Sequence, residues 1–184
     1  MQKSPEATDE LYALACGPDK RTRKYSSCIV NGVRFHIKSR DLRRRSHNCG
    51  LVVKGEHNDE EIYFYGVLTN IIQLNYIKHK QPILFECEWY EADKKKKSGI
   101  QIDEHFTSVN VNGRWYKNDP YVLAIQAKQV FYLNDTKLGT NWQVVQEFQH
   151  RHLYDPEIEK MDEDIDELVN NTVYQENESS GFVD

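Results

Sequence analysis

The chain has 184 residues, of which 39% are hydrophobic and 29% are charged, with a formal net charge of −5. This length suits one ordinary domain with a tail and excludes a large multidomain assembly within the chain. No apolar run reaches the roughly 20 residues that span a bilayer, and the polar N-terminus lacks an apolar leader. We therefore expect a soluble, intracellular protein without a membrane partner.

The charge is divided between a basic body and an acidic tail. Residues 155–184 hold eleven acidic residues and one basic residue, whereas residues 1–154 carry a net charge of +5. Residues 20–45, called here the basic segment, contain ten Lys or Arg residues and a single acid, Asp41. Such runs are often only solvated loops, but this density makes an anionic partner worth testing.

The first elements are predicted to be a short helix and a hairpin. Residues 6–16 place Leu11, Leu14 and Ala15 on one helical face and end at Gly17-Pro18, which supplies helix stop signals. Two short runs, 28–30 and 33–37, then flank Asn31-Gly32, the preferred pair for a type I′ turn. The period changes there from helix to strand, which predicts a β-hairpin.

The middle of the chain is predicted to form strands over residues 50–54, 61–76 and 82–90. A polar turn is expected at 55–60, and Gly66 predicts a bulge or sharp bend in the second strand. In the third strand, alternate residues are expected to point to the core, and these are Ile83, Phe85, Cys87 and Trp89. Tyr90 falls on the opposite face, which is expected to be accessible.

The last elements are expected after a charged loop at 91–99. A strand is predicted over 105–111, and Asn118 with Pro120 at the first helical position predicts a short helix over 121–128. Strands over 129–133 and 142–148 complete the set. Many short strands without βαβ alternation indicate an all-β fold, a small antiparallel barrel or sandwich with one or two short helices.

Three regions follow from these elements. We expect a short helix and basic linker over residues 1–24, a barrel-like domain over 25–154 and an acidic tail over 155–184. The tail has too little apolar content for a core and is expected to be disordered. Apolar residues at helical spacing within it leave open the alternative of a segment that folds on a basic partner.

Several strings in this order resemble a known family. They are 14-LACGP-18, 30-VNGVRFH-36, 64-FYGVL-68, 84-LFECEW-89 and 119-DPYVLAIQAKQVFY-132. Together they are similar to the plant domain of unknown function found C-terminal to the catalytic region of CACTA (En/Spm) type transposon proteins. The resemblance covers about residues 11–154 and implies a nuclear setting, but it supplies no catalytic residue. The element order also resembles bromo-adjacent-homology domains, which implies an SH3-like barrel.

Catalysis and metal binding have little support in the sequence. A transposon nuclease would need converging carboxylates, whereas the candidates lie in predicted turns: Asp103, Glu104, Asp119 and Asp135. Cys87 on an apolar strand is expected to be a core thiol. The pairs His47/Cys49 and His150/His152, with His36 and His57, lack the spacing of structural zinc sites, so hydrogen-bonded or solvated side chains are expected. We expect no enzyme activity, cofactor or small-molecule substrate.

Two binding surfaces are predicted instead. Flexible cations after the hairpin are expected to neutralise phosphates of DNA without reading bases, and these are Lys38, Arg40, Arg43, Arg44 and Arg45. Alternatively, accessible aromatic rings would form a chromatin-peptide surface that binds a methylated ammonium group, and these are Tyr90, Trp115 and Tyr116.

These observations lead to one main functional hypothesis. We expect a non-enzymatic accessory domain of a plant transposon-derived protein, located in the nucleus, that binds DNA or a transposase or chromatin protein. A chromatin-peptide reader and a degenerate remnant without activity are the alternatives.

Overall fold

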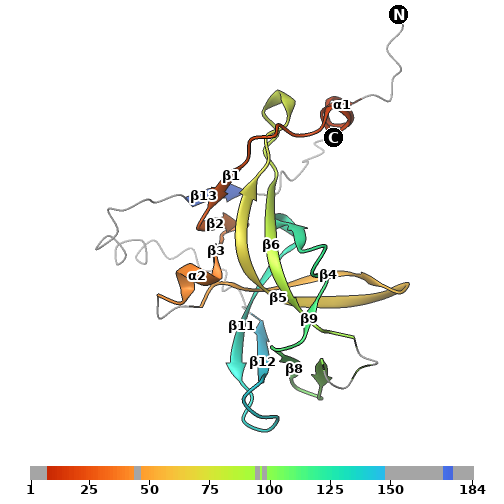
Figure 1. Ribbon diagram of the computed structural model, residues 1–184, viewed down its shortest axis with the longest axis vertical. Helices are drawn as coiled ribbons and strands as arrows, with labels where there is room; N and C mark the ends of the chain where they lie inside the picture. The colour runs from red at the N-terminus through yellow and green to blue at the C-terminus, as the bar shows by residue number, and fades with distance from the viewer. Residues whose placement is uncertain (1–7, 44–46, 94–95, 97–98, 148–171, 176–184) are drawn as a thin grey trace, which may run out of the picture.

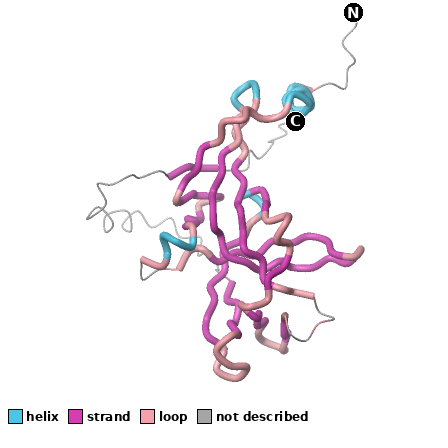
Figure 2. Tube along the Cα trace, in the orientation of Figure 1, coloured by secondary structure: helices cyan, strands magenta, loops and turns pink. Residues whose placement is uncertain are grey.

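The computed structural model describes residues 8–43, 47–93, 96, 99–147 and 172–175. Strands make up most of this part of the chain (Figure 2). Two short α-helices, α1 (Asp9–Cys16) and α2 (Lys38–Asp41), and two 3-10 turns, η1 (Ile77–His79) and η2 (Ala124–Gln126), complete it. Within the described ranges, no helix has the length and apolar content needed to cross a membrane.

An antiparallel sheet forms the body of the protein and curls into a half-barrel (Figure 1). Along its main path the order is β10-β6-β5-β4-β11-β12-β8-β7, with β1 added to β5 and β9 added to β6. The strands are β1 (Arg23–Tyr25), β4 (Gly50–His57), β5 (Glu60–Gln73), β6 (Ile83–Tyr90), β7 (Ile100–Ile102), β8 (Thr107–Asn110), β9 (Arg114–Trp115), β10 (Tyr121–Leu123), β11 (Lys128–Asn134) and β12 (Trp142–Glu147). The all-β, antiparallel prediction is confirmed, whereas the SH3-like order stays a prediction.

The first helix ends where the sequence predicts, but its buried face differs. Gly17 caps α1 with a φ of 72°, a left-handed conformation that glycine adopts without steric cost. Ala13 is the buried residue of α1, while Leu11 and Leu14 are more than half exposed. The expected apolar face is therefore wrong: the main partner of α1 is the η1 turn, and its small residue Ala13 is the one that is buried.

The predicted hairpin is confirmed. β2 (Ser27–Val30) and β3 (Val33–His36) pair antiparallel, with Val30 opposite Val33. Asn31 and Gly32 between them have φ values of 50° and 79°, as a type I′ turn requires. The hairpin inserts Cys28, Val30 and Phe35 into the main core.

The long β4–β5 and β5–β6 pairs confirm the middle strands and correct two details. β4 continues to His57, so the turn between β4 and β5 is only Asn58-Asp59, both at positive φ. The register between β5 and β6 shifts at residue 69 of β5, between Leu68 and Asn70, and not at Gly66. Gly66 instead allows close approach: a Cβ there would stand 2.8 Å from the carbonyl oxygen of Glu88.

The predicted helix over 121–128 is wrong. Residues 121–123 form β10, which pairs with β6, and only Ala124–Gln126 form a 3-10 turn. The proline signal at 120 is local, and the sheet edge of β6 offers the same residues a ladder of backbone hydrogen bonds. Sheet pairing therefore overrides the helix-start signal.

Two apolar clusters share the interior. The larger lies between the hairpin, β4, β5, β6 and η2 and includes Leu51, Leu68, Ile71 and Phe85, all fully buried. The predicted inward set of β6 belongs to it. The smaller cluster, around Val67, lies towards β7 and β8.

Four residues of the predicted tail are described, as β13 (Thr172–Gln175). β13 pairs in parallel with β2, with Thr172 opposite Ser27 and Gln175 opposite Val30, and completes a small sheet of order β13-β2-β3. The other tail residues lie outside the described part of the chain. β1 crosses the expected boundary at residue 24 and joins the N-terminal linker to β5.

Candidate nucleic-acid interface

The described cations of the basic segment lie in three neighbouring elements and in the residues directly before the first and after the last of them. β1, the β2–β3 hairpin and α2 follow one another in the chain and lie on one side of the long β5–β6 pair (Figure 1). Six of these cations are exposed, and they are Lys20, Arg21, Arg23, Lys24, Arg34 and Arg43. Lys38 and Arg40 are half-buried, while Arg44 and Arg45 lie outside the described residues. The predicted set is thus partly brought together.

Two of the cations predicted to contact phosphates, Lys38 and Arg40, already bind other side chains of the protein. The ammonium of Lys38 donates to Glu88 Oε2 at 2.9 Å, and Arg114 reaches the same oxygen at 3.1 Å. The Lys38 hydrogen bond is the main reason that the pKa of Glu88 lies below its usual value. Arg40 donates to the hydroxyl of Ser26 at 2.9 Å and so attaches α2 to the start of β2. Arg43 is exposed and is the predicted contact that best suits a phosphate.

The single acid of the basic segment is turned inward. Asp41 Oδ1 lies 3.0 Å from His36 Nδ1, and both side chains are 2% exposed. Asp41 Oδ2 accepts the backbone N–H of Asn48, so both carboxylate oxygens have partners. Because Asp41 is buried, it does not neutralise the exposed cations around it at short range. The surface of residues 20–43 therefore presents positive charge only.

The alternative aromatic surface is not assembled as predicted. Tyr90 is 5% exposed, with the Arg114 guanidinium 5.1 Å above its ring and Tyr132 against its edge. The expectation that Tyr90 turns outward is wrong, because the end of β6 is covered by the second apolar cluster. Burial also raises the pKa of Tyr90.

Trp115 and Tyr116 are half-buried in an aromatic cluster with Phe64, and Trp115 also packs against the apolar cluster that contains Tyr90. Phe64 stacks on Trp115 with ring centroids 5.6 Å apart, and Tyr116 meets both rings edge-on. The Tyr116 hydroxyl lies 2.7 Å from His57 Nδ1. These rings therefore contact one another, and Tyr90, Trp115 and Tyr116 do not form a common cage.

A pocket of about 490 Å³ lies beside the basic segment, between α2, β4 and β11. Its lining includes Lys38, Asp41, Cys49, Tyr90 and Tyr132. Burial, followed by the negative charge of Asp41, raises the pKa of the Cys49 thiol to about 12. The thiol is therefore protonated at neutral pH and is a poor nucleophile.

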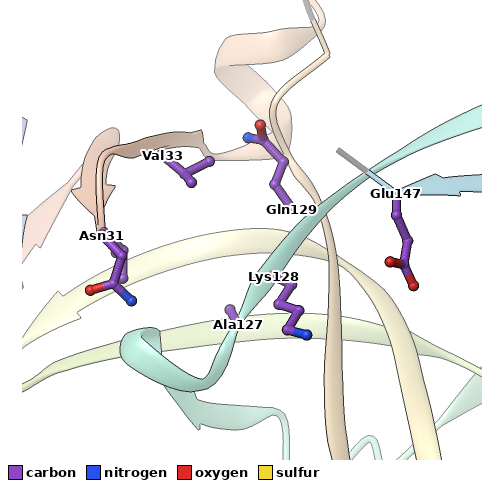
Figure 3. A pocket seen from close by; sticks show the side chains of 7 residues that line it. Asn31, Val33, Ala127, Lys128, Gln129 and Glu147 are labelled. Atoms are coloured by element: carbon purple, nitrogen blue, oxygen red, sulfur yellow. The ribbon is translucent and has the colours of Figure 1, made fainter. Parts of the chain in front are cut away.

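A second pocket of about 350 Å³ separates the hairpin from β11 (Figure 3). Gln129 extends from β11 towards the hairpin, whereas Lys128 points away from it and Glu147 stands at the end of β12 (Figure 3). The Gln129 amide donates to the Arg34 carbonyl at 2.7 Å, so it holds the hairpin on the sheet. The polar side chains that line this pocket do not converge on one point that a ligand would occupy.

The candidates for metal and nuclease chemistry are dispersed. Within the described residues, no three His, Cys, Asp or Glu side chains are grouped to hold a metal ion. His150 and His152 lie outside these residues. Asp135 accepts the Ser108 hydroxyl and two backbone N–H groups of its own turn, as a turn-capping carboxylate does.

Sequence reasoning missed the His36–Asp41 pair and the Gln129 bridge. A lone acid in a basic run, five residues after a histidine on an apolar strand, was the available signal for the first. The Gln129 bridge joins residues 95 positions apart, so no local sequence pattern indicates it.

Comparison with known proteins adds one finding. Searches of curated proteins and of solved structures found no match to the chain. The family match extends from the end of β5 into β12 and so leaves the basic segment outside it. Residues 72–145 of this chain are similar to the family described as "Domain of unknown function (DUF4216)".

Proposed function

We propose that this protein is a non-enzymatic accessory domain of a plant transposon-derived protein that acts in the nucleus and binds DNA electrostatically. The transposon origin rests on the resemblance of residues 11–154 and is compatible with the family match. The DNA-binding part rests on the basic segment. Its partners would be DNA phosphates and, beside them, transposase or chromatin proteins.

One observation carries this proposal: the only acid among the described residues of the basic segment is buried against His36. Six exposed cations therefore face solvent without a neighbouring carboxylate from their own segment. Each cation that meets a phosphate releases a condensed counterion, which makes affinity depend steeply on salt. The peptide-reader alternative is less well supported, because Tyr90 is buried and the rings of Trp115 and Tyr116 contact their own neighbours.

The test is binding of the full chain to duplex DNA across a salt series, measured by fluorescence anisotropy. The variant Arg34→Ala/Arg43→Ala removes two exposed cations of the basic segment. We expect the slope of log affinity against log salt to flatten by roughly 1.8, at about 0.9 for each phosphate contact. Lys38→Ala should flatten it less, because Glu88 already neutralises that ammonium.

The matched control is Lys117→Ala/Lys137→Ala, which removes the same charge from exposed sites outside the basic segment. A local interface predicts a smaller change of slope for this control. Equal slopes for both double variants would mean that binding follows net charge only. No binding by any variant at about 50 mM salt would reject the proposal and favour a remnant without activity.

A further inference from the structure

We propose that β13 is a cis-acting clasp: a strand of the acidic tail that docks on the β2 edge and competes with anionic ligands for the basic segment. This proposal rests on the proposed DNA binding and adds a mechanism that would regulate it. It predicts that docking depends on the strand itself and not on tail charge alone.

The β2 edge is a rigid template for an added strand. Cys28 and Val30 of β2 are at most 1% exposed and belong to the main core, and β3 pairs with the other edge. The free edge of such a strand presents unpaired N–H and C=O groups, which accept an extended segment in β-augmentation. In the described structure β13 occupies this edge in parallel over four residue pairs, beside β2 in Figure 1.

Docking brings the tail to the basic segment. Thr172 lies opposite Ser27, and the guanidinium of Arg40 lies 3.4 Å from the Ser27 hydroxyl. At the other end, Gln175 is opposite Val30, and β3 with Arg34 lies one strand further, on the other side of β2. β13 therefore runs beside β2, within the basic segment, on the edge away from β3 and next to the residue that Arg40 contacts.

The sequence around β13 supplies the competing charge. Eight acidic residues precede it within residues 155–171, and Glu176 and Glu178 follow it directly. β13 itself has no charged residue. An uncharged strand anchored between acidic runs holds a polyanion near the cations at an effective concentration that reaches about the millimolar range for short tethers.

Competition implies a reciprocal coupling between the tail and DNA. If the tail lowers DNA affinity, DNA must lower the docking of the tail by the same factor. With a docked-to-free ratio of about ten, the apparent DNA affinity falls about tenfold below that of the free basic segment. Both directions of the coupling are measurable.

The experiment uses the full chain with Val173→Pro/Tyr174→Pro, which leaves the net charge unchanged. Proline has no backbone N–H and disrupts ladder pairing, so β13 should leave the β2 edge. The control Ser179→Pro/Ser180→Pro places the same two prolines in the tail beyond β13. Hydrogen exchange of the Ser27–Val30 amides reports docking, and anisotropy with duplex DNA at about 50 mM salt reports affinity.

We expect faster exchange over Ser27–Val30 and roughly tenfold tighter DNA binding in the β13 proline variant, but not in the control. Duplex DNA should also speed this exchange in the unmodified protein. Unchanged exchange in the β13 variant would refute docking. Faster exchange with unchanged DNA affinity would refute competition, whereas faster exchange with no DNA binding by any protein would reject the DNA-binding function alone.

Discussion

Replacing Asp41 with alanine should destabilise the protein strongly. The carboxylate lies 3.0 Å from His36 Nδ1 and also accepts the Asn48 backbone N–H. Its removal leaves two polar groups of the interior without their partner, and each such loss costs about 1–3 kcal/mol. We therefore expect the free energy of unfolding to fall by about 2–6 kcal/mol, a large share of the 5–15 kcal/mol typical of a domain.

Urea unfolding followed by tryptophan fluorescence measures this change. Asp103→Ala is the matched control, because Asp103 is exposed and its loss should cost less than about 0.5 kcal/mol. Asp41→Asn keeps the side-chain shape and one acceptor oxygen, so we expect an intermediate loss. Equal unfolding midpoints for the alanine variants of Asp41 and Asp103 would refute the inward-facing arrangement on which the basic segment's charge depends.

Three further predictions follow from the sheet and its thiols. Gly66→Ala should lower stability by about 1–3 kcal/mol in thermal unfolding, because the added Cβ meets backbone and ring atoms at 2.8 Å; an unchanged midpoint would contradict this close approach. Glu88→Gln should cost less than about 1 kcal/mol at pH 7, since Glu88 is 40% exposed and solvent screens its pairs. Because the folded-state pKa of Glu88 is lowered, this cost should be present above pH 4.5 and vanish as the pH falls further; a cost that persists at pH 2 would count against the ion pair. Iodoacetamide at pH 8 should modify exposed Cys16 and spare Cys49, whose pKa of about 12 leaves little thiolate, and peptide mass spectrometry would show equal labelling if this is wrong.

Much of the fold was predictable because the responsible signals are local. The hairpin follows from Asn31-Gly32, since few residues other than these tolerate the positive φ values of a type I′ turn. Alternation in β6 identified its inward face, because successive side chains of a strand point to opposite sides. The helix stop at Gly17 has the same local character.

The candidate site was predictable only as a concentration of charge. The sequence shows that cations gather in the basic segment, but not that Lys38 is paired with Glu88, 50 residues away. Nor does it show that Asp41 faces inward. Both depend on where α2 rests against the sheet, which is a matter of packing between distant elements.

By itself, the sequence determined the class of the fold, the hairpin, the inward side of β6 and the separation of basic body from acidic tail. Only the tertiary structure decided that Tyr90 is covered, that Gly66 provides close approach and that residues 121–123 join β6. The physical reason is the range of the interactions. Turn geometry, alternation and net charge are properties of neighbouring residues, whereas burial and strand partners depend on segments that the chain brings together only when it folds.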